Sequence, residues 1–259
     1  LSQIFSSSTD VEILKELNEA QIKPVIHGNG PLIVIAGAGS GKTRVLTHRI
    51  AYLIKNGIDP FEILALTFTN KAAREMKERI ASILKSNDSK NLWMGTFHSV
   101  FAKLLRIEAD KLGYPSNFTI YDTQDSERLV SAVIKEMGLE KDVYKPKQIR
   151  NRISSFKNNL ITVKAYFNDP DLVESDKMSR RPKMGEIYNE YVNRCFKAGA
   201  MDFDDLLLRT NELLNIYPEV LAKYQNRFKY ILVDEYQDTN HSQYLIVKAL
   251  SDKFQNICC

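Results

Sequence analysis

Four apolar residues, Leu32 to Ile35, lead directly into the glycine-rich stretch Ala36 to Thr43 (AGAGSGKT). A continuous apolar run of this length is typical of a strand buried on both faces of a parallel sheet. The glycines predict a tight turn, and the residues that follow, to about Lys55, have helical character. Such a turn gathers backbone N–H groups at a helix N-terminus, so we expect the chain to fold around a parallel sheet.

The same alternation of strand and helix continues along the chain. Apolar strand character recurs at 63–68, near 92–94, at 230–233 and at 257–259, and helical patterns follow at about 70–80, 97–105 and 244–250. This alternation favours a parallel sheet with helices on its faces, and the predicted fold class is α/β. Between 123 and 199 the sequence is helical and polar, which we interpret as an inserted, mostly helical domain.

Composition narrows the class of protein. Of the 259 residues, 44% are hydrophobic and 26% are charged, which is typical of a folded globular protein. No apolar run reaches membrane-spanning length and the N-terminal residues lack the pattern of a secretory signal, so we expect a cytoplasmic protein. The cysteines Cys195, Cys258 and Cys259 are too few for a disulfide framework and lack zinc-ligand spacing.

The stretch from Ala36 to Thr43 has the spacing of a loop that binds nucleotide phosphates. In such a loop backbone N–H groups contact the phosphates, Lys42 reaches the β and γ phosphates, and the Thr43 hydroxyl binds Mg²⁺. We therefore predict ATP and Mg²⁺ as ligands. The alternative, a chance glycine-rich turn, is disfavoured by the GKT ending, although Ala36 replaces the first glycine of the strict pattern. The predicted phosphate-binding residues are Ala36, Gly37, Ala38, Gly39, Ser40, Gly41, Lys42 and Thr43.

A second candidate feature is the apolar run 230–233, which ends in two acids, Asp234 and Glu235. Two acids after a strand often form a solvated turn. With a phosphate loop upstream, this arrangement instead places one carboxylate at Mg²⁺ and the next beside an attacking water. We predict that Asp234 binds Mg²⁺ together with Thr43, and that Lys42, Asp234 and Glu235 are catalytic. Glu235 as a general base for water favours a hydrolase over a small-molecule kinase.

The stretch Val233–Asn240 (VDEYQDTN) resembles the DExxQD motif of the UvrD/Rep/PcrA-like DNA helicases of superfamily 1A, with Tyr236 where phenylalanine is frequent. Four further stretches resemble other motifs of that family and occur in the family's order: Leu17–Gln21, Thr67–Ala73, Gly95–Ser99 and Met201–Leu206. The five motifs are spread from Leu17 to Asn240, so the resemblance covers essentially the whole chain. The resemblance implies a RecA-like ATP-binding domain, called 1A, at 1–122 and 200–259. It implies that the helical stretch 123–199 is the inserted domain 1B.

The resemblance also implies further contacts to the nucleotide. It suggests that Gln21 reads the adenine edge and that Gln237 of the DExxQD motif lies at the nucleotide. Taken alone, Gln21 is more easily explained as a surface residue of a helix. Arg44, directly after the phosphate loop, is another candidate for the nucleotide site, and its alternative is an exposed arginine in the first helical turn.

Two short stretches are candidates for contact with single-stranded DNA. Phe68 offers a face for base stacking, and the helix start that follows offers N–H groups to a phosphate, although a capped amphipathic helix explains the same pattern. For the second stretch, Gly95–Ser99, the resemblance implies a contact to single-stranded DNA. Without the resemblance, His98 is equally well explained as a core histidine whose hydrogen bonds are satisfied, or as part of a helix start. The predicted DNA-binding residues are Phe68, Thr69, Asn70, Thr96, Phe97 and His98.

Basic residues gather between Lys145 and Lys164, where the sequence contains no Asp or Glu. Such an excess can contact phosphates, but a solvated helix face is the more common explanation. The resemblance places the inserted domain along DNA without identifying the residues that touch it. The basic residues are Lys145, Lys147, Arg150, Arg152, Lys157 and Lys164.

The resemblance implies that this sequence is the N-terminal part of an ATP-dependent 3′–5′ DNA helicase or translocase. Its partners would be single-stranded DNA and junctions of single and double strands, in DNA repair or replication. The family's later motifs, with arginines from a second RecA-like domain, and its domains 2A and 2B are not among these residues. Since one such arginine accelerates phosphoryl transfer about 10³-fold or more, we expect this chain to hydrolyse ATP hardly at all. The alternatives are a P-loop phosphotransferase acting on a small molecule and a nucleotide- or DNA-binding module without turnover.

Overall fold

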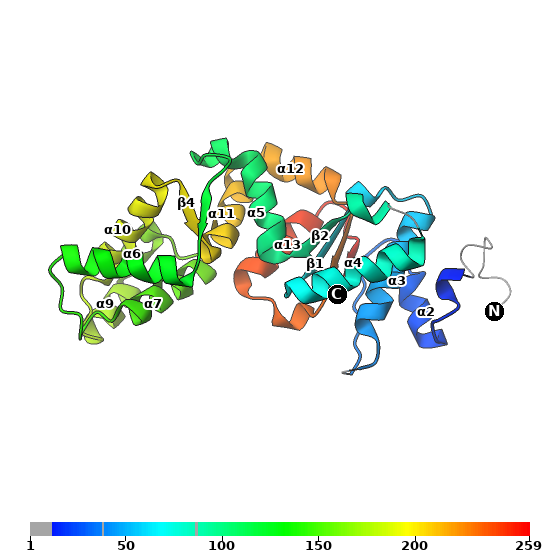
Figure 1. The fold of residues 1–259 in the computed structure, drawn as a ribbon, viewed down its shortest axis with the longest axis horizontal. Coiled ribbons are helices and arrows are strands. Elements are labelled where there is room, and N and C mark those ends of the chain that lie inside the picture. Colours follow the sequence, from blue (N-terminus) through cyan, green and yellow to red (C-terminus); the bar gives the residue numbers. More distant parts are fainter. Residues whose placement is uncertain (1–11, 38, 86–87) are drawn as a thin grey trace. The chain divides into compact units, whose positions relative to one another are not determined.

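The structure is a computed structural model that describes residues 12–37, 39–85 and 88–259. The described residues form two compact units. The first contains the residues up to Val100 together with Tyr217–Thr239 and Tyr244–Cys259, and the second contains Phe101–Ile216 and Asn240–Gln243. Figure 1 shows a sheet surrounded by helices in the first unit and a mostly helical second unit.

A parallel sheet with the strand order β2-β1-β5-β6 lies at the centre of the first unit. Its strands are β1 (Ile63–Thr67), β2 (Trp93–Thr96), β5 (Tyr230–Val233) and β6 (Ile257–Cys258). Ala65 of β1 pairs with Met94 on one side and with Leu232 on the other. Every residue of β1 and β5 is buried, as expected for strands covered on both faces. The predicted α/β class with a parallel sheet is confirmed.

Helices cover this sheet because each has an apolar face. In α4 (Asn70–Leu84), Met76, Ile80 and Leu84 are buried and are spaced by four residues, so they lie on one side of the helix. The Thr69 side chain accepts a hydrogen bond from the Ala72 N–H and caps the helix start. The other helices of this unit whose bounds lie within the described residues are α2 (Glu19–Val25), α3 (Lys42–Lys55), α12 (Pro218–Arg227), most of α13 (His241–Ser251), the start of α5 (Phe97–Glu108), and the short 3₁₀ turns η1 (Pro60–Glu62), η2 (Asp88–Asn91) and η4 (Tyr236–Asp238).

The apolar segment before the glycine-rich loop differs from the expected strand buried on both faces. It runs beside β6 and is joined to it by backbone hydrogen bonds, but it forms only an isolated bridge, between Leu32 and Cys258. Leu32 and Val34 pack against the core, whereas Ile33 is 73% exposed and Ile35 is 92% exposed. Successive side chains of an extended segment point to opposite faces, and the described residues leave the face with Ile33 and Ile35 largely exposed. The prediction of burial on both faces is therefore wrong.

The second unit consists mainly of helices around their own apolar core. Tyr188, Tyr191 and Ile149 are almost fully buried in this core. The helices are α6 (Thr123–Glu136), α7 (Pro146–Asn158), α8 (Val163–Phe167), α9 (Pro170–Met178), α10 (Met184–Lys197), α11 (Phe203–Ile216), the rest of α5 and the 3₁₀ turn η3 (Ala109–Leu112). Among the described residues of either unit, no helix is both long enough and apolar enough to cross a membrane.

The compact units and the expected domains divide the chain at different residues. The expected insertion covers 123–199, whereas the second compact unit also includes the residues on either side, from Phe101 and as far as Ile216. Two short parallel strands, β3 (Thr119–Tyr121) and β4 (Ala200–Asp202), join these flanking stretches to each other. The assignment of 123–199 to a separate domain stays a prediction.

Candidate functional site

The glycine-rich loop leads into the N-terminus of α3. Gly39 has φ 76° and Gly41 has φ 90°, which is the left-handed region that glycine adopts without steric cost. Gly41 directly precedes the helix and has no side chain to cap it, so the first N–H groups of α3 are available to an anion. Ala38, which the sequence also predicts to bind phosphate, lies outside the described residues.

The Lys42 side chain folds back over this loop. Its Nζ donates hydrogen bonds to the carbonyl oxygens of Ala36, at 3.0 Å, and Gly37, at 3.3 Å. The Ser40 hydroxyl donates to the same Gly37 oxygen at 2.6 Å. The ammonium group is therefore held within the loop by neutral acceptors, which a charged phosphate oxygen would replace with a stronger hydrogen bond.

The end of β5 brings Asp234 to the start of α3. The Thr43 hydroxyl donates to Asp234 Oδ2 at 3.5 Å, and the Asp234 N–H donates to Leu66 O of β1 at 2.9 Å. Asp234 is only 8% exposed. Burial, and then the nearby Glu235 carboxylate, raise the pKa of Asp234 above its usual value. A buried carboxylate of this kind favours a cation as its neighbour.

Mg²⁺ fits the donor set at this position. The Thr43 hydroxyl and the Asp234 carboxylate are hard oxygen ligands on two different elements, held next to each other. Mg²⁺ in nucleotide sites needs only one or two protein ligands, because waters and phosphate oxygens complete its coordination. Within residues 12–37, 39–85 and 88–259, no group of three or more His, Cys, Asp or Glu residues is arranged to hold a metal ion, so a metal site built only from such residues is not found there.

Glu235 has a backbone conformation that costs energy. Its φ of 51° lies in the left-handed region, which is unfavourable for a residue with a side chain. The Gln237 amide Nε2 donates a hydrogen bond to the Glu235 carboxylate and so holds its side chain. Strained residues of this kind concentrate at functional sites, where the conformation directs a side chain.

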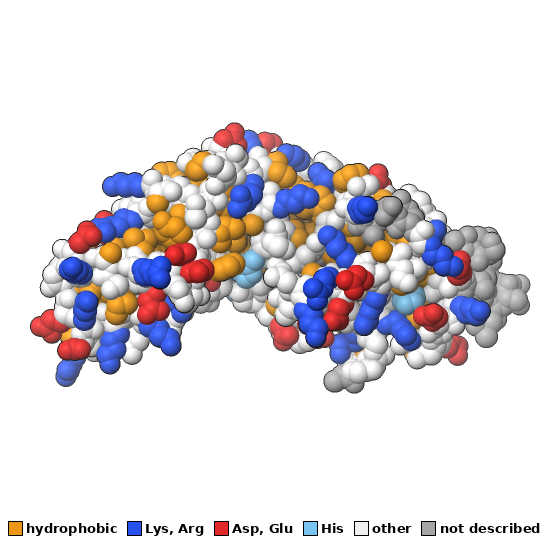
Figure 2. Space-filling model, viewed as in Figure 1, with side chains coloured by type: hydrophobic (Ala, Val, Ile, Leu, Met, Phe, Trp, Pro, Cys, Tyr) orange, Lys and Arg blue, Asp and Glu red, His pale blue; other side chains and the backbone are white. Residues whose placement is uncertain are grey.

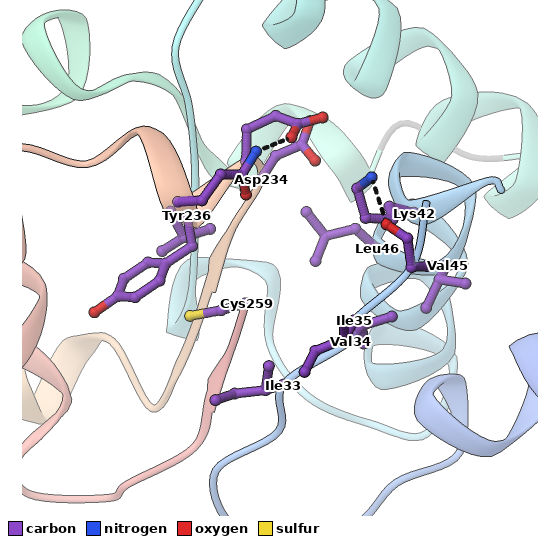
Figure 3. Close-up of a pocket in the computed structure, with 13 residues that line it drawn as sticks. Ile33, Val34, Ile35, Lys42, Val45, Leu46, Asp234, Tyr236 and Cys259 are labelled. Atoms are coloured by element: carbon purple, nitrogen blue, oxygen red, sulfur yellow. Dashed lines mark hydrogen bonds between the residues drawn. The ribbon is translucent and has the colours of Figure 1, made fainter. Parts of the chain in front are cut away.

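Two cavities lie beside the glycine-rich loop and the end of β5 in the first unit, and both are lined by Lys42 and Glu235. The polar cavity, of about 390 Å³, is also lined by the glycine-rich loop and Gln21. The other cavity, of about 380 Å³, is mainly apolar and includes Ile33 and Ile35. Figure 3 shows the latter, with the Lys42 and Asp234 side chains extending from α3 and from the end of β5. Each cavity has the volume of a small-ligand site.

Gln21 contacts the loop, but both ends of its amide are already hydrogen-bonded. Its Oε1 accepts from the Asn18 N–H at 3.2 Å, as part of a capping box at the start of α2. Its Nε2 donates to Ser40 O at 3.1 Å, and a Cβ atom at Gly41 would lie 2.7 Å from that nitrogen. These bonds use one N–H of Nε2 and one acceptor position of Oε1, and since an amide has a second of each, Gln21 can contact an adenine edge while keeping both.

Two exposed arginines line the polar cavity, Arg44 of α3 and Arg79 of α4. Arg44 is one of the residues predicted from the sequence. Arg79 is not, because α4 reaches the cavity only through the packing of α4 against α3. The only feature of the local sequence that bears on the position of Arg79 is that it directly precedes Ile80, which is buried on the core side of the same helix.

Strand register brings the two predicted DNA-binding stretches together, since Thr67 of β1 pairs with Thr96 of β2. The ring centroids of Phe68 and Phe97 lie 5.4 Å apart. Phe97 is only 1% exposed, whereas Phe68 and His98 are half-buried. Phe97 therefore supports the Phe68 ring and does not present its own face to solvent. The residues at the start of α4, Thr69 and Asn70, are exposed.

The basic run is less available to DNA than its sequence suggests. Lys157 has a fully buried side chain, and its Nζ lies 2.7 Å from Asp202 Oδ2 and 2.8 Å from Asp205 Oδ2. Burial disfavours the lysine charge, but the two carboxylates more than offset it and hold the pKa of Lys157 well above its usual value. Arg152 Nε lies 3.2 Å from Asp176 Oδ1. Including Lys157 among the candidate phosphate contacts is therefore wrong.

Three lysines of the basic run are exposed, namely Lys145, Lys147 and Lys164. Figure 2 shows Lys and Arg side chains interspersed with Asp and Glu over the face in view, without a continuous basic stripe. These lysines are spread over the start of α7 and over α8. The exposed cations of the run are therefore too scattered to define a nucleic-acid surface by charge alone.

The parallel sheet, the glycine-rich loop at the start of α3 and the adjoining Thr43 and Asp234 side chains define a nucleotide-binding α/β protein of the P-loop type. The family model described as UvrD/REP helicase N-terminal domain matches residues 17–259, and the chain belongs to this family. The resemblance to UvrD-like helicases is thereby confirmed, and the parallel sheet with its helices agrees with a RecA-like core.

Similar proteins include "ATP-dependent DNA helicase PcrA" of Bacillus subtilis (strain 168), which is 44% identical over 254 residues. The protein of the same name from Staphylococcus aureus (strain Mu50) is 43% identical over 248 residues. In both comparisons the match covers 95% of this chain and 33% of the relative. The chain therefore spans about a third of the length of these relatives.

Proposed function

We propose that this chain is the N-terminal, ATP-binding part of an ATP-dependent DNA helicase or translocase. The observation that carries the proposal is the approach of the Thr43 hydroxyl to the Asp234 carboxylate, 3.5 Å, beside Lys42 and the strained Glu235. Membership of the UvrD/REP family supports it. The relatives called PcrA are named as ATP-dependent DNA helicases, which supports the same activity for the protein that contains this chain.

Each residue of the site has a proposed role. The loop N–H groups and Lys42 bind the phosphates, and Thr43 and Asp234 would hold Mg²⁺. When bound, Mg²⁺ would neutralise charge on the β and γ phosphates. Glu235 accepts a proton from the attacking water, and its hydrogen bond with Gln237 orients the carboxylate before the nucleotide arrives.

We infer that single-stranded DNA, and its junctions with duplex, are the partners of this protein. The contact of Phe68 with Phe97 and the exposed start of α4 support a place where a base can stack next to N–H groups that bind phosphate. The 3′–5′ direction and a role in repair or replication rest on the family resemblance alone.

We also propose that these 259 residues on their own bind ATP and hydrolyse it hardly at all. The later arginines that the family resemblance implies do not occur in this sequence, and the relatives are about three times longer than the match. Arg44 and Arg79 line the polar cavity from the first unit itself, which supports nucleotide binding without a second RecA-like domain. Steady turnover by the isolated chain would contradict this proposal.

ATP hydrolysis by the full-length protein, with and without single-stranded DNA, tests the proposed function. We expect DNA to stimulate hydrolysis and Glu235→Gln to lower kcat by about 10²-fold or more, because the variant keeps the shape of the side chain but loses the base. ATP binding is measured in parallel and should persist. The matched control is Glu75→Gln, a change of the same kind at an exposed glutamate of α4.

Two results would redirect the proposal. If hydrolysis proceeds at the same rate without DNA, the helicase assignment fails and transfer of phosphate to a small molecule becomes the better explanation. If Glu235→Gln retains the native rate under DNA stimulation, the helicase assignment stands and a different group must act on the water.

A further inference from the structure

A buried arginine of α3 binds the backbone at the end of α2. Arg49 is only 2% exposed. Its Nη1 donates to the carbonyl oxygens of Pro24, at 3.0 Å, Val25, at 3.3 Å, and His27, at 2.6 Å. Its Nη2 donates to Gly28 O at 3.2 Å. Burial lowers the pKa of Arg49, and these four neutral carbonyl oxygens stabilise the guanidinium in place of water.

These carbonyl oxygens belong to the C-terminal end of α2 and to the residues directly after it. The last carbonyl groups of a helix have no partner within the helix, and a cation near them is favourable. α2 contains only seven residues, and a helix of this length is not stable in water without tertiary contacts. α2 packs against α3 (Figure 1), and Val25 and Val45 belong to one apolar cluster. Arg49 therefore fixes one end of a helix whose position depends on α3.

The first turn of α2 carries Gln21, which lines the polar cavity. Gln21 is one helical turn before the carbonyl groups that Arg49 binds, so a shift at the C-terminal end of α2 moves the Gln21 amide. Besides its bonds with Asn18 and Ser40, this amide has a second N–H and a second acceptor position.

The second donor and acceptor of the amide match adenine and not guanine. Adenine presents an acceptor, N7, beside a donor, the 6-amino group, and a glutamine amide pairs with both. The same edge of guanine presents two acceptors, N7 and O6, so the glutamine oxygen would face another acceptor. The preference for one base over the other therefore reports whether the Gln21 amide is held in place.

We propose that Arg49 is a positioning residue for recognition of adenine, because it holds α2 so that the Gln21 amide faces the base. The inference rests on the proposed function, since it requires ATP in the polar cavity. Arg49 is not among the described residues that line this cavity, so it acts through α2 and not on the nucleotide. Without Arg49, the carbonyl oxygens at the end of α2 lose their buried donor, and this end moves towards water, which replaces it.

The base preference of the native 259-residue chain measures this role. The probes are ribose-labelled, non-hydrolysable analogues of ATP and GTP, so that both bases are unmodified, and each is titrated with Mg²⁺. We expect the ATP analogue to bind about fivefold or more tightly than the GTP analogue, because the bidentate contact is made to adenine alone. Arg49→Met keeps an unbranched side chain that tolerates burial but loses the donors. In this variant the ratio should approach one, while the affinity for the GTP analogue stays near the native value.

Three further variants separate positioning from a general loss of structure. Gln21→Ala removes the amide and should abolish the preference, and adding Arg49→Met to it should cause no further change. Arg49→Lys keeps the charge but replaces the fork of donors with a single ammonium group, and should give an intermediate preference. Arg227→Met removes a half-buried arginine of the same unit, which lies 4.7 Å from the centroid of the Trp93 ring. This control should lower thermal stability and keep the native preference.

The outcomes are distinct. An unchanged preference in Arg49→Met or in Arg49→Lys would overturn the role of Arg49, and so would an equal loss of preference in Arg227→Met. Loss of affinity for both analogues by the same factor in Arg49→Met would indicate damage to the phosphate loop and would also overturn it. If Arg49→Met does not fold, Arg49→Lys decides.

The native chain separates this inference from the proposed function. If it binds neither analogue, the proposed function fails first and the role of Arg49 with it. If it binds both analogues equally, nucleotide binding stands, and recognition of the base through Gln21 and Arg49 is wrong.

Discussion

Replacing Lys157 with methionine should strongly destabilise the second unit. The Lys157 Nζ lies 2.7 Å from Asp202 and 2.8 Å from Asp205, and all three side chains are buried. The variant leaves two carboxylates in a site of low polarity without that cation, and breaking a buried ion pair from one side costs about 3–5 kcal/mol. We expect the free energy of unfolding, from urea titration, to fall by this amount. The thermal midpoint should fall by roughly 6–20 °C.

The loss should depend on pH in a defined direction. In the native chain burial opposes ionisation of Asp202, but Lys157 more than offsets it and lowers the pKa of Asp202. A lowered pKa contributes stability above the unfolded carboxyl value, near 3.9, and this stability is lost as the pH falls through the folded value. Without Lys157, burial and mutual repulsion should raise both carboxyl pKa values. The variant would then regain stability as the pH falls from neutral towards about 4, and its deficit should narrow.

The matched control is Lys147→Met, the same change at an exposed position of the same helix. Surface substitutions usually change stability by less than about 0.5 kcal/mol. A loss in Lys157→Met within about 1 kcal/mol of this control would refute the reasoning, since it would mean that the two buried carboxylates do not need the cation. A deficit that widens on acidification would contradict the pH argument alone.

Two further predictions concern the nucleotide site. Gly41→Ala should weaken binding of a non-hydrolysable ATP analogue by about tenfold or more, because its φ of 90° is unfavourable for alanine. The control Gly28→Ala does not have a positive φ and has no atom within 4 Å, so it should bind normally, and equal loss in both would contradict the argument from backbone conformation. Asp234→Asn should abolish the Mg²⁺-dependent binding of a non-hydrolysable ATP analogue. In the absence of nucleotide, the same variant should be more stable than the native chain at neutral pH. Because the pKa of Asp234 is raised in the folded native chain, the native chain loses stability as the pH rises through that folded pKa. The difference in thermal midpoint between Asp234→Asn and the native chain should therefore shrink as the pH falls towards 4.

The parts of the fold that the sequence predicts are those encoded by adjacent residues. The apolar runs of β1 and β5 are continuous because both faces of these strands are covered, and the glycines of the loop adopt conformations that only glycine tolerates easily. The run before the loop shows the limit of this reasoning. Its composition resembles that of β1, but the burial of Ile33 and Ile35 depends on what covers their face, and composition does not encode the neighbour.

The parts that the sequence does not predict depend on contacts between distant residues. Lys157 belongs to a basic run by position, yet its charge is neutralised by Asp202 and Asp205, which lie more than forty residues further along the chain. Arg79 reaches the polar cavity only because α4 packs on α3. β3 and β4 contain three residues each, which is too short for an alternating pattern to stand out.

The pairing between the segment before the loop and β6 has a consequence for folding during synthesis. A hydrogen bond beside this pairing, from the Gly30 N–H to Asn256 Oδ1, joins residues that are 226 positions apart in the sequence. At ribosomal rates of about 5–20 residues per second, the phosphate loop is synthesised roughly 10–45 s before its neighbouring strand. During this interval the loop has glycine flexibility and an unpaired, apolar lead segment. Early in synthesis, the most recognisable motif of the chain is therefore a candidate for chaperone binding rather than for nucleotide.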